Sequence, residues 1–235
     1  MPVVWPVQPG LVPYEEARLW QRALVEARIE GRIPNVLLLL EHPHTYTLGR
    51  AADAGHILIG EAERHRLGVS VHRIERGGDV TYHGPGQLVG YPIMDLREWK
   101  QDVHAYLRAL EEVLIGTLAE YGIVAHREEK LTGVWVGQEK VAAIGVAFRR
   151  WVSYHGFALN VNPDLSYFQK IIPCGIVDRG VTSMARLLGR NVAWDDVAAR
   201  IVRCFCDVFA MEAVEGGADA LHRLNLYWDR LAPAG

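Results

Sequence analysis

The 235-residue sequence has few cysteines and no long apolar run. Cys174, Cys204 and Cys206 cannot all pair with one another, so this is not a disulfide scaffold and we expect a reducing compartment. No stretch approaches the roughly 18 apolar residues of a membrane helix. The N-terminus lacks the basic and apolar regions of a signal peptide. Together these absences predict a cytoplasmic protein without a membrane segment.

Excess positive charge is absent as well. The formal net charge is −3 at pH 7, whereas binding to a phosphate backbone needs a basic surface, so no nucleic-acid partner is expected. The chain has no Gly-Lys-Ser/Thr phosphate loop, and its ten histidines form no His-Glu-x-x-His spacing. No Cys-x-x-Cys pair occurs either. The sequence therefore predicts no metal site and no nucleotide-binding loop of the common type.

The apolar patterns that are present predict a mixture of helices and strands. Three- and four-residue periodicity predicts helices over residues 11–30, 103–121, 195–211 and 218–231. Short apolar or alternating runs predict strands over 36–40, 69–75, 88–94, 133–136, 141–148 and 155–161. Frequent hairpins favour an α/β fold in which a mixed, largely antiparallel sheet is packed with helices. We expect residues 1–235 to form a single domain, with a small C-terminal lobe from about residue 191 as the alternative.

A glycine-rich segment at residues 76–87 is the first candidate for a binding function. Its glycines, including Gly77 and Gly78, are expected to make it mostly loop and to allow close approach of backbone to a ligand. Arg76, Thr81, Tyr82 and His83 place hydrogen-bonding side chains beside that backbone. An ordinary glycine-rich turn is the alternative interpretation.

Cys174 and Lys140 are the candidates for catalysis. Pro173 and Gly175 flank the cysteine and would leave room and a backbone N–H beside its sulfur, although a buried structural cysteine is the commoner case. Lys140 opens a strand that continues with Ala142, Ala143 and Gly145, small residues that would leave a slot for a ligand. A solvated lysine is the alternative. A hydrolase pairing Cys174 with His83 or His155 also remains open.

Taken together, four segments resemble the lipoyl (octanoyl) transferase family. They are Arg-Gly-Gly-x-x-Thr-Tyr-His-Gly-Pro-Gly-Gln at 76–87, Lys-Val-Ala-Ala-Ile-Gly at 140–145, His-Gly-Phe-Ala-Leu-Asn at 155–160 and Pro-Cys-Gly-Ile at 173–176. The similarity runs from about residue 11 to beyond residue 183. It implies an α/β fold like the biotin and lipoate protein ligase catalytic domains.

The resemblance also implies an activity and its partners. Members of the family are cytoplasmic acyltransferases, typically monomeric, that use no ATP and no metal. They move an octanoyl (or lipoyl) group from acyl carrier protein to a specific lysine of acceptor proteins. These acceptors are the lipoyl domains of 2-oxoacid dehydrogenase complexes and the glycine-cleavage H protein.

By the same resemblance, Cys174 is the nucleophile and Lys140 lowers the pKa of its thiol. The resemblance further implies that the substrate-binding walls are formed by Arg76, Gly77, Gly78, Asp79, Val80, Thr81, Tyr82, His83, Ala143, Ile144, Gly145, His155, Gly156 and Phe157. The carriers are expected to be acidic, and a complementary basic docking surface is predicted from Arg73, Arg76, Arg149, Arg150, Lys170 and Arg179. Scattered solubilising charge is the alternative.

Three other functions remain as alternatives. An ATP-dependent lipoate or biotin ligase on the same fold would use Lys140 on an adenylate and would not need Cys174. A Cys–His thioesterase would release free octanoate. An inactive binding module would hold carrier domains without acquiring an acyl group.

Overall fold

The computed structural model describes residues 1–129, 131–172 and 179–215. In chain order the elements are β1 (Val3–Leu11), α1 (Tyr14–Ile29), β2 (Asn35–Glu41), β3 (Thr45–Leu48), η1 (Ala54–His56), α2 (Glu61–Arg66), β4 (Ser70–Arg73), β5 (Val80–His83), β6 (Gln87–Ile93), η2 (Leu96–Glu98), α3 (Val103–Ala119), β7 (His126–Glu128), β8 (Leu131–Val136), β9 (Glu139–Arg149), β10 (Val152–Asn160), η3 (Leu165–Lys170), β11 (Gly180–Val181), α4 (Met184–Leu188), α5 (Trp194–Phe209) and β12 (Glu212–Ala213).

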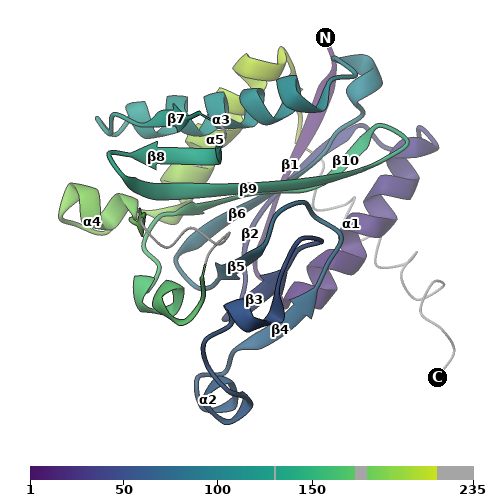
Figure 1. The fold of residues 1–235 in the computed structure, drawn as a ribbon. Coiled ribbons are helices and arrows are strands. Elements are labelled where there is room, and N and C mark those ends of the chain that lie inside the picture. The colour runs from purple at the N-terminus through teal and green to yellow at the C-terminus, as the bar shows by residue number, and fades with distance from the viewer. Residues whose placement is uncertain (130, 173–178, 216–235) are drawn as a thin grey trace, which may run out of the picture.

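The larger sheet is nine-stranded in the order β12-β1-β2-β6-β10-β9-β8-β7, with β11 pairing β9. The pairs from β2 through β7 are antiparallel, whereas β1 runs parallel to β2 and β11 parallel to β9. Helix α1 covers one face, and α3 with α5 covers the other (Figure 1). The predicted α/β fold with a largely antiparallel sheet is confirmed.

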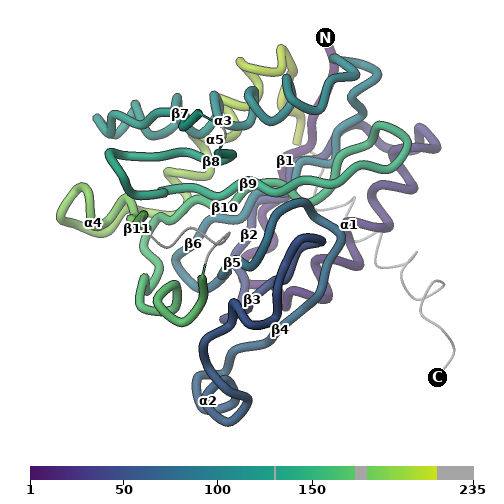
Figure 2. Tube along the Cα trace, in the orientation of Figure 1, coloured from purple at the N-terminus to yellow at the C-terminus, as the bar shows by residue number. Residues whose placement is uncertain are grey.

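A smaller sheet, in the order β4-β3-β5, lies beside the larger one and has its own core (Figure 2). Its buried residues include Tyr46, Val80 and Tyr82, against which Tyr167 and Phe168 of η3 pack. The cores of the larger sheet are built from aliphatic runs such as Leu37–Leu40, which are inaccessible to solvent. The smaller sheet thus buries a core of its own, separate from the cores on the two faces of the larger sheet.

The glycine-rich segment contains a strand, so the prediction that residues 76–87 are mostly loop was wrong in part. Residues 80–83 form β5, which pairs antiparallel with β3 through Val80↔Leu48 and His83↔Thr45. The strand was not predicted because glycines flank it on both sides, and glycines are typical of loops. The residues Val-Thr-Tyr-His alternate between apolar and hydrogen-bonding side chains, which is the pattern of a strand between two different environments.

Strand β1 was not predicted, because Pro6 and Pro9 interrupt its sequence. Proline cannot donate a hydrogen bond to a neighbouring strand, so it is tolerated where one side of the strand is unpaired. Strand β12 pairs only with Val3 and Val4, which leaves the rest of β1 at the edge of the sheet. The prolines therefore lie on the edge portion of β1.

Helix α5 contributes to the core that it shares with α3. Phe205 and Phe209 are almost fully buried there, while Cys204 and Cys206 of the same helix are half-buried thiols, as expected for packing residues. The predicted helix at 218–231 lies outside the described residues, so the extent of the domain stays a prediction. Within the described ranges no helix has the length and apolarity needed to cross a membrane.

Candidate active site

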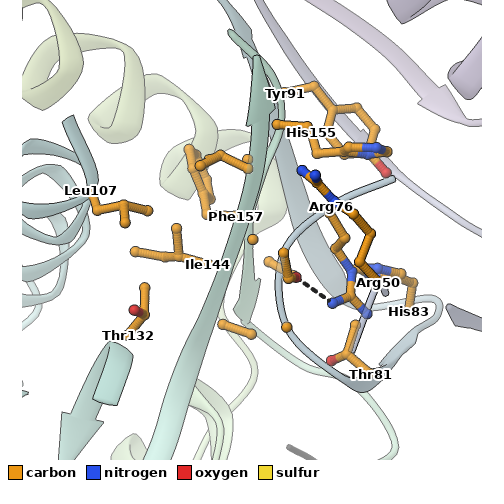
Figure 3. Close-up of a pocket in the computed structure, with 18 of the residues that line it drawn as sticks. Arg50, Arg76, Thr81, His83, Tyr91, Leu107, Thr132, Ile144, His155 and Phe157 are labelled. Atoms are coloured by element: carbon orange, nitrogen blue, oxygen red, sulfur yellow. Dashed lines mark hydrogen bonds between the residues drawn. The ribbon is translucent and has the colours of Figure 1, made fainter. Parts of the chain in front are cut away.

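A cavity of about 470 Å³ lies between strands β9 and β10 of the larger sheet and the loop that joins β4 to β5. Figure 3 shows its lining in two groups. Leu107, Thr132 and Ile144 lie on the side toward α3, and Arg76, Thr81 and His83 lie toward the smaller sheet. The cavity thus has an apolar part and a polar part, and its size is in the range of small-molecule sites.

Eleven of the predicted wall residues line this cavity. They are Arg76, Gly77, Gly78, Thr81, His83, Ala143, Ile144, Gly145, His155, Gly156 and Phe157. Asp79, Val80 and Tyr82 are not among the lining residues. Since side chains alternate along a strand, Thr81 and His83 face the cavity while Val80 and Tyr82 enter the core of the smaller sheet. The Asp79 carboxylate instead meets the imidazole of His56 at 2.6 Å.

Arg76 fixes the loop that closes the polar side of the cavity. Its side chain is only about 8% exposed and donates hydrogen bonds to the carbonyl and hydroxyl oxygens of Thr47, each at 2.9 Å. A Cβ on Gly145 would lie 2.9 Å from Cδ of Arg76 and 3.3 Å from the Gly77 carbonyl. The loop itself therefore occupies the space beside Gly145, so this glycine permits close packing and does not leave the open slot that its size suggested.

His83 is held in one tautomer by a chain of side chains. Nε2 of Gln87 donates to the carbonyl of Tyr82 (3.2 Å) and to Oδ1 of Asn160 (2.9 Å). Its Oε1 must then accept from Nδ1–H of His83, at 2.9 Å. Nε2 of His83 is therefore the unprotonated nitrogen, and no described residue hydrogen-bonds it. Burial lowers the pKa of His83 well below its usual value, which keeps the ring neutral.

His155 also lines the cavity and has an unusual backbone. Its φ of 55° lies in the left-handed region, and its amide N–H donates to Oε1 of Gln21 at 2.7 Å. Burial lowers the pKa of His155, although Glu75 lies 3.9 Å from its ring nitrogen. The side chain therefore presents a buried imidazole beside Arg76 (Figure 3).

Sequence reasoning missed a cluster of rings around the polar part. Tyr14 and Tyr91 line the cavity, and His42 lies behind them, with its Nε2 2.7 Å from the Tyr91 hydroxyl. Nδ1–H of His42 donates to the carbonyl of Val12 at 2.7 Å, so Tyr91 is the donor to Nε2. Burial lowers the pKa of His42 to about 4. These residues come from separate elements, so no local spacing connects them.

The other residues that were not predicted come mainly from the α3 side and the strand ends. They are Arg50, Val103, Leu107, Leu131, Thr132, Val146, Ala147, Phe148 and Ala158. Leu107 belongs to the apolar face that predicted helix α3, and such a face does not distinguish a core position from a cavity position. Most of the remainder continue strands that already contained predicted wall residues.

Lys140 lines the cavity at the beginning of β9. Its Nζ lies 3.4 Å from the carbonyl of Thr132 and 4.7 Å from the centroid of the Trp135 ring. Arg179 stacks on the same ring at 5.1 Å and pairs with Glu128 at 3.0 Å. Two cations therefore share one aromatic ring. Lys140 brings positive charge to this end of the cavity, whereas the charge of Arg179 is paired with Glu128.

Cys174 lies outside the described residues. The chain on either side of 173–178 is described: Ile172 precedes it and Arg179 follows it. Gly180 and Val181 then pair with Glu139 and Lys140, and the amide of Thr182 donates to the Lys140 carbonyl at 3.0 Å. The segment that contains Cys174 therefore leads directly into the strand beside Lys140.

The basic residues proposed as a docking surface do not form one patch. Arg76 is buried in the cavity wall, Arg149 pairs with Glu26 at 2.5 Å and Lys170 pairs with Glu63 at 3.2 Å. Arg179 is engaged by Glu128 and Trp135 as described above. That prediction was therefore wrong for Arg76, and the charges of Arg149, Lys170 and Arg179 are balanced locally. In the described ranges no three His, Cys, Asp or Glu side chains cluster as a metal site would require.

Solved structures of ligases share the fold of this chain. The chain matches the crystal structure of lipoate-protein ligase A bound with ATP with a TM-score of 0.72 at 17% identity, covering 92% of this chain and 88% of that one. A biotin protein ligase from Aquifex aeolicus matches with a TM-score of 0.50 at 12% identity, covering 88% and 69%. At such identities these likenesses show the fold alone, which is that of the lipoate and biotin ligase catalytic domains.

The family model of the lipoyl protein ligase A/B catalytic domain matches residues 13–206, and the chain belongs to this family. Among curated proteins it is 53% identical to an octanoyltransferase of Solibacter usitatus over 90% of this chain and 95% of that protein. An octanoyltransferase of Gloeobacter violaceus is 50% identical over 91% and 94%.

These relatives assign the chain to the octanoyltransferases, which are acyltransferases. The ATP-dependent ligase alternative is not favoured, because the relatives at 50% and 53% identity are octanoyltransferases, whereas the solved ligase structures are 12% and 17% identical.

Proposed function

We propose that the chain transfers an octanoyl group from the thioester of acyl carrier protein to a lysine of lipoyl domains, through an acyl-thioester on Cys174. The acceptors would be the lipoyl domains of 2-oxoacid dehydrogenase complexes and the glycine-cleavage H protein. The observation that carries the proposal is the position of Lys140, which lines the cavity beside the strand into which the Cys174 segment leads.

In the first step, the Cys174 thiolate attacks the thioester carbonyl, and the carrier thiolate leaves. An ordinary thiol with a pKa near 8.5 is only a few per cent ionised at pH 7. The Lys140 ammonium would stabilise the thiolate, and each unit by which the thiol pKa falls corresponds to about 1.4 kcal/mol. The ammonium then protonates the departing carrier thiolate, which leaves Lys140 neutral.

In the second step, the amine of the acceptor lysine attacks the acyl-thioester and the Cys174 thiolate leaves. Neutral Lys140 takes the proton that the amine loses as the amide forms, which restores the ammonium. A thioester and an amine thus give an amide and a thiol. No bond to phosphate is made, so the proposed reaction uses neither ATP nor a metal ion.

The cavity supports the binding of an acyl chain. Its α3 side is lined by Leu107, Ile144 and Phe157, whose apolar surface suits an alkyl chain. Removing that chain from water contributes about 0.8 kcal/mol per buried methylene.

We further propose that the protein acts in the cytoplasm as a monomer, as its resemblance to the family implies.

The test is octanoyl transfer to a purified lipoyl domain, with octanoyl-acyl carrier protein as donor and ATP omitted. Wild-type protein is expected to modify the domain, and Cys174→Ala to lose the activity while Cys204→Ala and Cys206→Ala keep it. Transfer that requires ATP and free octanoate would instead indicate a ligase. Release of free octanoate without modification of the domain would indicate a thioesterase.

A further inference from the structure

Asp79 belongs to the glycine-rich segment, yet it does not line the cavity. Its Oδ1 accepts a hydrogen bond from the amide of Val80 at 2.7 Å, and its Oδ2 lies 2.6 Å from Nδ1 of His56. The carboxylate is largely buried, at about 8% exposure for the residue. Since a carboxylate only accepts, His56 must present Nδ1–H to it. Asp79 therefore joins the cavity-lining loop to His56.

His56 in turn is joined to the chain that enters the Cys174 segment. The His56 carbonyl accepts from the amide of Ile172, at 2.9 Å. The amide of Leu58 donates to the carbonyl of Lys170, also at 2.9 Å, and Ile57 pairs with Ile171 as an antiparallel bridge. Residues 56–58 and 170–172 thus form a short ladder, whose last bond lies two positions before Cys174 in the sequence.

We propose that His56 and Asp79 are positioning residues that fix Ile172, the last described residue before the Cys174 segment, relative to the loop at residues 76–78. This role rests on the proposed function, in which Cys174 is the nucleophile. Neither residue touches the substrate. The hydrogen bond between them holds η1 against the glycine-rich loop, and the ladder transmits that position to Ile172.

The short helix η1 itself makes few side-chain contacts, although Ile57 and Ile59, which follow it, pack against the core of the smaller sheet. It buries none of its three side chains, and its N-cap, Asp53, bonds only within the helix, to the amide of Gly55 at 2.8 Å. A segment with little buried apolar surface opens locally at low cost once its hydrogen bonds are weakened. Loss of the His56–Asp79 hydrogen bond is therefore expected to loosen the ladder without unfolding the sheets.

The test compares His56→Ala, Asp79→Ala and the double variant with wild-type protein in a single turnover with octanoyl-acyl carrier protein. Displacement of a reacting group by about 1 Å can cost about 100-fold in rate. We expect acyl-enzyme formation to slow about 10- to 100-fold in each single variant, with little change in KM for the donor. The double variant should be no slower than the singles, because both remove one interaction.

Two further variants separate positioning from general damage. His56→Asn keeps an N–H donor near the position of Nδ1 and should recover most of the acylation rate. His65→Ala removes an exposed histidine that lies 3.7 Å from Glu61, a pair of similar chemistry with no link to residues 170–172, and should change nothing. Amide hydrogen exchange at Leu58 and Ile172 should accelerate in His56→Ala and Asp79→Ala alone.

The proposal is overturned if His56→Ala or Asp79→Ala acylates at the wild-type rate, or if exchange at Ile172 is unchanged in both. A uniform rise in exchange across the two sheets would also overturn it, since the effect would then be loss of fold. A wild-type protein that forms no acyl-enzyme would contradict the proposed function and this role with it. If wild-type protein acylates normally and the variants do so too, only the role of the His56–Asp79 hydrogen bond is refuted.

Discussion

The two sheets that enclose the cavity contribute different things to it. Near the cavity the larger sheet presents small residues, at Ala143, Gly145 and Gly156, which permit close approach, beside the large apolar side chains of Ile144 and Phe157. The smaller sheet and its loop present Arg76, Thr81 and His83, and hydrogen bonds to neighbours fix Arg76 and His83. The larger sheet therefore determines most of the shape of the site, and the smaller sheet supplies much of its polarity, together with Tyr91 and His155.

Lys140 is the exception, because it is a charged residue on the larger sheet. We therefore expect the chemistry at the N-terminal end of β9, where the small side chains begin and where β11 pairs with Glu139 and Lys140. The rest of the larger sheet is expected to tolerate no added volume and to contribute no proton transfer. The predictions below test this division between the two walls.

Lys140→Ala is expected to have the largest effect. Loss of a positioned acid–base group costs about 100- to 10,000-fold in rate, and the side chain buries too little surface for its removal to unfold the protein. Octanoyl transfer and thermal unfolding would be measured together. Arg186→Ala is the matched control, because this exposed arginine pairs with Glu139, the residue beside Lys140, at 3.4 Å. Equal activity of both variants would place the chemistry elsewhere.

Gly145→Ala tests whether the larger sheet tolerates added volume. The new Cβ would lie 2.9 Å from Cδ of Arg76, so the loop must shift. We expect a loss of about 1–3 kcal/mol in the free energy of unfolding and a fall in transfer rate of at least about 10-fold. Gly60→Ala is the control, because no atom lies within 4 Å of its added Cβ. A fully active Gly145→Ala protein would refute the close packing of the loop.

His42 lies where the chain crosses from the larger sheet to the smaller one, and it predicts a dependence of stability on pH. With a folded pKa of about 4 against a usual 6.5, the unfolded state binds a proton between these values and the folded state does not. Stability should therefore fall as the pH is lowered through this window, by about 2 kcal/mol between pH 7 and 5 from this residue.

Denaturant unfolding of wild-type protein and of His42→Gln at the two pH values measures this contribution. The variant should be less stable at pH 7 but should lose about 2 kcal/mol less on acidification. His65→Gln, which changes an exposed histidine, should retain the wild-type dependence. A variant with the full wild-type dependence would show that other groups account for it.

The smallest expected effects separate the two faces of β5. Tyr82→Phe removes the hydroxyl that lies 2.8 Å from Nδ1 of His44 and should cost about 1 kcal/mol of stability with activity retained. Thr81→Val changes a cavity-lining hydroxyl and should lower activity by a few-fold, with stability nearly unchanged. Unfolding and transfer assays on both proteins suffice. The opposite assignment of effects would mean that β5 is turned the other way.

Local patterns predicted the elements with long apolar runs, such as β2, α3 and α5, because burial of one face imposes a period on the sequence. They failed at β1 and β5, where prolines at an edge and glycines in a ligand-facing loop obscure that period. Residues 80–83 do alternate as a strand does. Interpreted as a strand, they would have been predicted to place Thr81 and His83 on one face and Val80 and Tyr82 on the other.

The candidate site was predicted mostly through family resemblance, and eleven of its predicted wall residues do line one cavity. What could not be predicted depends on tertiary contacts. The rings of Tyr14, His42 and Tyr91 come from three elements, and the link from Asp79 through His56 to Ile172 joins three separate segments. No spacing within a single element carries such information.

The central claim is that an octanoyl group passes through Cys174. The most direct test is the intact mass of the protein after incubation with octanoyl-acyl carrier protein in the absence of ATP, for wild type and Cys174→Ala. We predict one octanoyl adduct on wild type alone, which disappears when a lipoyl domain is added and appears on that domain. The absence of an adduct on wild type, with the domain modified only when ATP and free octanoate are supplied, would contradict the account.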